Sequence, residues 1–153
     1  MIELTKPSAL PAFSWSEVSM SWLLVVAAGM MLFSLVEAWL ATLIIYTKVK
    51  WLAKIFKVPH NLVRSHIDYL MMTTLVIAVY FLCLHLQIVL PKPVIVLLII
   101  GVILNPFGFF LQSIDPSIGK SETVLGKLST CISFLPTTIG FAYPMCAVIG
   151  KLV

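Results

Sequence analysis

Apolar residues fill four long stretches of the chain almost without interruption, and polar residues gather between them. A helix needs about 20 mostly apolar residues to cross the ~30 Å hydrocarbon core of a bilayer. Membrane-spanning barrel strands alternate apolar and polar positions, and these stretches do not, so helices are predicted. The predicted spans are residues 20–46, 68–89, 94–112 and 127–150.

The segments between the spans carry turn signals. Pro91 and Pro93 predict a tight turn that makes the second and third spans antiparallel neighbours, and Pro116 with its polar neighbours predicts a longer loop before the fourth. Residues 1–19 are expected to form an irregular or interfacial lead-in. The first span is too long and too polar at its start for a cleaved signal peptide, so residues 20–153 are expected to form one transmembrane domain.

The composition agrees with this pattern. Of the 153 residues, 61% are hydrophobic and only 10% are charged, and the mean hydropathy is +1.10. A water-soluble globular domain has far more charge to cover its surface. The expected fold class is therefore all-α, an integral membrane bundle of four transmembrane helices.

The basic residues predict an orientation. Two loops on one side hold seven of the ten Lys and Arg residues, namely Lys48, Lys50, Lys54, Lys57, Arg64, Lys120 and Lys127. The positive-inside rule places these loops in the cytoplasm and both termini outside, as in a multi-pass protein of a bacterial inner membrane. The net charge of +4 is attributed to contact with anionic lipid headgroups. Aromatic residues are not interleaved with the basic ones, so nucleic-acid binding is not expected.

Three cysteines lie inside the apolar stretches, at Cys83, Cys131 and Cys146, and no two of them form a CxxC pair. They are expected to be small buried side chains and not a redox centre.

Ionisable groups inside a membrane are costly, so Glu37 in the first span is a candidate functional residue. It lies on the order of 13 Å from the cytoplasmic end of that helix. The alternative interpretation is a protonated carboxyl that only hydrogen-bonds a neighbouring helix. Other polar groups fall in the same half of the bundle and predict a lined cavity, although small polar residues also serve helix packing; they are Thr73, Thr74, Asn105, Ser129, Ser133 and Thr137.

His66 and Asp68 are expected where the basic loop enters the second span. A single axial histidine is enough to hold haem iron when an apolar slot takes the macrocycle. The candidate slot residues are Tyr69, Met72, Phe107, Phe109 and Phe110, with Arg64, Lys57 and Lys54 placed for the propionates. The alternative is a capping or interfacial histidine. His85 lies roughly 28 Å further along the helix and cannot share a ligand with His66 within one chain.

Two stretches resemble the small four-helix membrane isomerases, styrene oxide isomerase and hydroxylaminobenzene mutase. Residues 64–72, RSHIDYLMM, are similar to the histidine motif of that family's second helix, and residues 104–110, LNPFGFF, to the polar and aromatic run of its third. The resemblance covers about the last two thirds of the chain. It implies a homotrimer with haem b at the subunit interfaces, held by His66. Ferric iron would act as a Lewis acid on a small hydrophobic epoxide or N-hydroxyl substrate, which rearranges without a cosubstrate.

The chain departs from the family's pattern at three places. Met72 stands where the family has asparagine, Phe110 where it has tyrosine, and Val102 near its aspartate. Either Glu37, Asp68 and Asn105 form a different catalytic set, or the chain binds haem for sensing, transport or electron transfer. Two further alternatives are a glutathione-dependent membrane enzyme, which the single arginine disfavours, and a structural subunit of a larger assembly.

Overall fold

The computed structural model describes residues 19–118 and 124–153, and every regular element in them is a helix. The helices are α1 (Ser21–Ile45), α2 (Lys50–Ile55), α3 (Pro59–His85), α4 (Lys92–Ile114) and α5 (Val124–Leu152). Within the described residues, four helices are long and apolar enough to cross a membrane: α1, α3, α4 and the Cys131–Leu152 part of α5. The all-helical, four-span fold class is therefore confirmed, and the chain is a multi-pass membrane protein. Residues 1–18 of the expected lead-in lie outside the described residues.

One helix boundary differs clearly from the prediction. We predicted a second span from residue 68, whereas α3 begins at Pro59, so His66 and Asp68 lie inside the helix and not at its entrance. Proline is well suited to the first turn of a helix, where its missing N–H is not needed. The hydropathy pattern did not reveal this start because the first turns of α3 are polar. These turns still pack inward, and their buried side chains include Leu62 and Ser65. The short helix α2 was not predicted.

The turn between α3 and α4 has a defined structural cause. The N–H of Ile88 donates to the Cys83 carbonyl at 2.8 Å, and the N–H of Gln87 donates to the Leu84 carbonyl at 3.2 Å. These two bonds form a Schellman motif, which requires a left-handed residue, here Gln87 with φ 54°. Pro91 then caps α4. The expected tight connection between antiparallel neighbours is confirmed.

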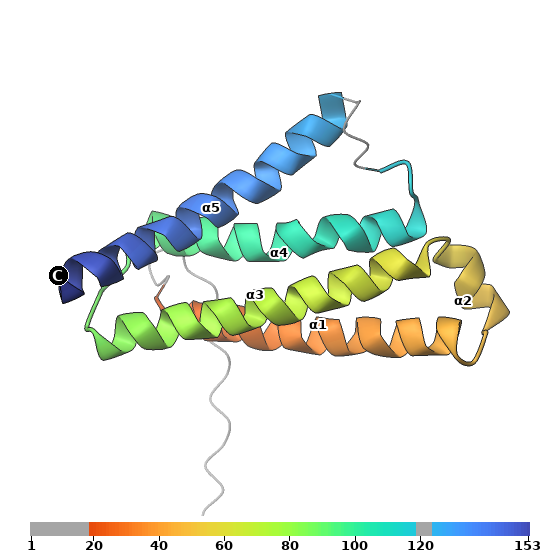
Figure 1. Ribbon diagram of the computed structural model, residues 1–153, viewed down its shortest axis with the longest axis horizontal. Helices are drawn as coiled ribbons and strands as arrows, with labels where there is room; N and C mark the ends of the chain where they lie inside the picture. The colour runs from red at the N-terminus through yellow and green to blue at the C-terminus, as the bar shows by residue number, and fades with distance from the viewer. Residues whose placement is uncertain (1–18, 119–123) are drawn as a thin grey trace, which may run out of the picture.

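The long helices pack in the order α1, α3, α4, α5, each mainly against the next (Figure 1). Helices α4 and α5 touch through their backbones, because Gly101 faces Thr137 and Gly140 faces Leu98. Small residues permit such close approach between membrane helices. Beyond this crossing the N-terminal half of α5 diverges from α4 (Figure 1).

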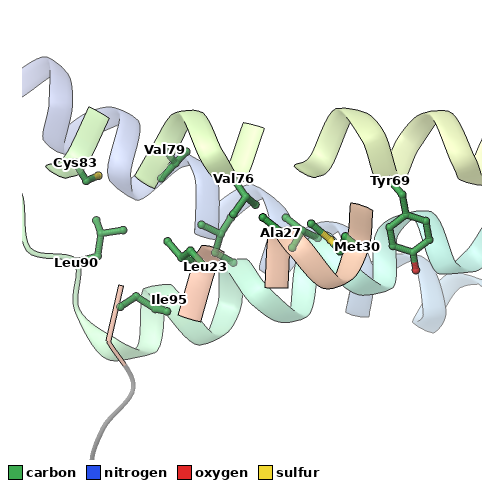
Figure 2. Close-up of a cluster of buried hydrophobic side chains, with 11 residues drawn as sticks. Leu23, Ala27, Met30, Tyr69, Val76, Val79, Cys83, Leu90 and Ile95 are labelled. Carbon is green, nitrogen blue, oxygen red and sulfur yellow. The ribbon is translucent and has the colours of Figure 1, made fainter. Parts of the chain in front are cut away.

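Two apolar clusters fill the interior. The larger cluster lies toward the end of the bundle remote from α2 and is partly drawn in Figure 2; it includes Leu23, Val76 and Leu98. The smaller cluster closes the α2 end, where Leu52 and Phe56 from the α2 region pack against α1 and α3. Between the two clusters, α1 buries Ser34 and Glu37, and α3 buries Ser65. These three residues form the polar layer, which holds the candidate site.

The cysteine prediction was correct for one residue and wrong for two. Cys83 is buried, but Cys131 and Cys146 are exposed. They lie on α5, which in a single chain packs mainly against one helix, α4.

Candidate functional site

Glu37 lies at the junction of α1, α3 and α4, and its side chain is fully buried. The Ser65 hydroxyl is 2.6 Å from Glu37 Oε1 and also 3.2 Å from the Pro106 carbonyl oxygen. Glu37 Oε2 has no hydrogen-bond partner among the described residues. One serine therefore links the carboxyl of α1 to the backbone of α4, and one carboxyl oxygen remains unsatisfied in the interior.

His66 is hydrogen-bonded to α1 one helical turn away from Glu37. Its Nδ1 atom lies 2.8 Å from both the carbonyl oxygen and the hydroxyl oxygen of Ser34. The Ser34 hydroxyl in turn lies 3.3 Å from the His66 carbonyl oxygen, to which it donates. Two adjacent cross-links, Ser34 with His66 and Glu37 with Ser65, thus fix α3 against α1.

These contacts assign the tautomer of His66. A carbonyl oxygen only accepts hydrogen bonds, so the 2.8 Å contact to the Ser34 carbonyl places the hydrogen on Nδ1. The lone pair is then on Nε2, which has no hydrogen-bond partner among residues 19–118 and 124–153. Histidines that ligate metals show the same arrangement, with the second ring nitrogen donating to a carbonyl or carboxylate.

Arg64 and Asp68 do not join His66 in the way the sequence predicted. The Arg64 guanidinium lies 4.2 Å from the centroid of the Phe109 ring on α4, and it attracts the Asp68 carboxylate one turn along α3. Helix positions two apart point in different directions. His66 therefore faces α1 while Arg64 faces α4, so one chain does not bring them to a shared ligand.

The remaining polar candidates lie on three helices, α3, α4 and α5. Asn105 is half-buried and makes no hydrogen bond to a described residue. Thr73 is buried with an unpartnered hydroxyl, whereas Thr74 and Thr137 donate to carbonyls of their own helices. The side chain of Ser129 lies outside the described residues. These contacts do not test the predicted cavity, which stays a prediction.

The aromatic candidates cluster, but beside the histidine and not around it. Phe110 stacks on Phe107 with centroids 5.8 Å apart and meets Phe33 edge-on at 5.4 Å. Phe33 also meets Tyr69 edge-on at 5.1 Å. Met72 packs against the larger apolar cluster. Two residues of this aromatic group are joined to the site through the chain: Phe33 precedes Ser34, and Phe107 follows Pro106, whose carbonyl oxygen lies 3.2 Å from the Ser65 hydroxyl.

A pocket of about 440 Å³ lies between α1, α3 and α4. Its volume is within the range of small-molecule sites, about 300–1,000 Å³. His66 and Glu37 do not line it. The lining residues are Val25, Val26, Gly29, Met30, Phe33, Tyr69, Ile103 and Phe107.

The donor set decides which cofactors fit. Where the structure describes side chains, no three His, Cys, Asp or Glu residues come together as a metal site. A chelated metal ion is therefore poorly matched. A metal already held in a macrocycle needs only one axial protein ligand, and His66 with its free Nε2 fits that requirement.

Sequence reasoning missed the two serines that organise this site. Ser34 and Ser65 are fully buried, and among the described residues they supply the side-chain hydrogen bonds made to His66 and Glu37. The available signal was their position, since Ser65 precedes His66 and Ser34 lies one turn before Glu37. No protein-family model, no characterised protein and no solved structure matches the chain. The resemblance to the membrane isomerases therefore stays a prediction.

Proposed function

We propose that this protein is a haem-dependent membrane isomerase in which His66 is the axial ligand of haem b. The observation that carries the proposal is the 2.8 Å bond between His66 Nδ1 and the Ser34 carbonyl. This bond fixes the imidazole ring and leaves Nε2 as the ligating nitrogen. The resemblance of residues 64–72 to the isomerase histidine motif points to the same residue.

The surroundings of His66 support a cofactor shared between copies of the chain. Leu35 and Ile67, the residues next to Ser34 and His66, are 49% and 51% exposed. An apolar surface at this depth faces lipid or another subunit. The homotrimer implied by the resemblance would cover it, and a second copy could supply the walls that one chain lacks.

The bound iron would supply Lewis acidity toward the oxygen of an epoxide or N-hydroxyl substrate. The protein's own residues would hold the ring and orient the substrate. Glu37, with one oxygen unsatisfied, is the best placed of the three candidates, because its Ser65 partner directly precedes His66. Among the described residues, Asp68 and Asn105 make no hydrogen bond to Ser34 or His66, and in this proposal they contribute at the site of a neighbouring copy.

The first experiment is an absorption spectrum of the protein purified in detergent after expression with added haem precursor. We expect a Soret band in the wild type and in His85→Ala, the matched control at the far end of α3. We expect the band to be lost in His66→Ala. A wild type without haem, or a His66→Ala variant with an unchanged spectrum, would refute the proposal.

The second experiment measures the reaction. The haem-loaded protein is incubated with an aryl epoxide or an aryl hydroxylamine, without any cosubstrate. Isomerisation gives a product of unchanged mass, and we expect this product with wild type and not with His66→Ala. Haem binding without turnover of either substrate would leave the haem assignment intact and overturn the isomerase.

A second candidate function is haem binding for sensing, transport or electron transfer. One observation favours it: among the described residues, His66 is hydrogen-bonded to Ser34 and not to Asp68 or Asn105. Rapid reduction of the bound haem by a quinol, with a spectrum typical of two axial ligands, would select this function over isomerisation.

A further inference from the structure

The lining of the pocket between α1, α3 and α4 includes one glycine. Gly29 lies in its wall, and a Cβ atom added there meets no atom within 4 Å. A larger residue at this position would project into the empty space. Gly29 lies well inside α1, so the pocket is at the level of the lipid hydrocarbon and not at the headgroups.

The pocket has aromatic walls and one polar pair. Phe33 and Tyr69 meet edge-on in its lining, and Phe107 adds a third ring. The Tyr69 hydroxyl donates its hydrogen to the Ile103 carbonyl at 3.1 Å, and both residues line the pocket. Figure 2 shows the Tyr69 side chain reaching from α3 toward α4.

The direction of that hydrogen bond sets the ligand chemistry. A tyrosine hydroxyl that has donated its only hydrogen still has lone pairs to accept another bond. No charged side chain lines the pocket. It therefore offers aromatic surface and a hydrogen-bond acceptor to an uncharged molecule.

We infer that this pocket binds a small aromatic molecule that carries one O–H or N–H donor and enters from the lipid. The donor group reaches the Tyr69 oxygen, and the ring system packs against Phe33 and Phe107 over Gly29. The site is separate from His66 and does not depend on whether that histidine holds haem.

The test uses two fluorinated probes of the same shape, a naphthol and a methylnaphthalene, which differ in the hydrogen-bond donor. Saturable binding to the detergent-solubilised protein is followed by fluorine NMR. We expect the naphthol to bind about fivefold more tightly than the methylnaphthalene, which is the usual size of one neutral hydrogen bond. In Tyr69→Phe the two probes should bind equally.

A matched pair of variants tests the location. Gly29→Leu fills the pocket and should weaken naphthol binding at least tenfold. Gly108→Leu places the same side chain at another helical glycine with open space around it, outside the pocket, and should bind as wild type does. A Cβ atom at either glycine meets no atom within 4 Å, so both variants are expected to fold, and circular dichroism checks this.

Three results would overturn the inference. The first is unchanged naphthol binding in Gly29→Leu. The second is equal binding of the two probes to the wild type, since the ligand would then need no donor. The third is a change of oligomeric state in Gly29→Leu but not in Gly108→Leu, which would make the pocket an interface between copies of the chain.

Discussion

Gly140→Ala tests the packing of α4 on α5. A Cβ atom at Gly140 would lie 2.6 Å from Leu98 Cα and 2.8 Å from the Leu98 nitrogen. Both are backbone atoms, so no side-chain rotation relieves the contact, and the helices must separate by about an ångström. Overpacking of this kind costs roughly 1–3 kcal/mol of unfolding free energy.

The matched control is Gly150→Ala on the same helix. A Cβ atom there meets nothing within 4 Å. Alanine also favours the helix by up to about 1 kcal/mol relative to glycine. We therefore expect Gly150→Ala to be as stable as the wild type or slightly more stable, so the same substitution changes the sign of its effect within one helix.

The assay is reversible unfolding by sodium dodecyl sulfate in mixed micelles, followed by circular dichroism and tryptophan fluorescence. Gly140→Ala should unfold at a lower detergent fraction than wild type, and Gly150→Ala should not. If Gly140→Ala unfolds together with the wild type, α4 and α5 do not touch at this glycine. The packing order derived for the bundle would then be wrong at its last helix.

Three further predictions concern the polar layer and the orientation. Ser65→Ala removes the hydrogen bond to buried Glu37 and should lower the unfolding free energy by about 1–3 kcal/mol. The control Thr74→Ala, at an exposed hydroxyl, should lower it by less than about 0.5 kcal/mol. Equal effects in the same unfolding assay would contradict the role of Ser65. Glu37→Gln keeps an acceptor for Ser65 and should lower the unfolding free energy by under about 1 kcal/mol. Glu37→Ala leaves a cavity and should lower it by roughly 2–4 kcal/mol. A glutamine variant as unstable as the alanine variant would refute this. A membrane-impermeant maleimide should label Lys54→Cys only from the cytoplasmic side and Val153→Cys only from the outside, and the reverse pattern would invert the predicted topology.

The candidate site was predicted in its residue types but not in its contacts. Glu37 and His66 stand out in the sequence because ionisable groups are rare in membrane spans. Their partners do not, because a serine in a transmembrane helix is ordinary, and only the helix packing shows that Ser34 and Ser65 meet them. The predicted grouping of Arg64 with His66 is not made by contacts within one chain, for the same reason. The two residues are close in sequence, but their side chains leave α3 in different directions. Arg64 contacts Phe109 on α4, and His66 contacts Ser34 on α1.

The sequence alone determined that the chain crosses a membrane with four helices, since the length and apolarity of each span depend only on local composition. It also predicted the position of the α3–α4 connection from Pro91 and Pro93, although the turn itself is made at Gln87. The tertiary structure decided which helices are neighbours and which face of α3 carries the polar layer. It also decided that Gly29 lines a pocket, whereas Gly101 and Gly140 pack against the backbone of the neighbouring helix. These features depend on atoms from different helices. Because lipid tails are as apolar as the side chains between helices, the faces that pack together cannot be identified from their hydrophobicity in the sequence.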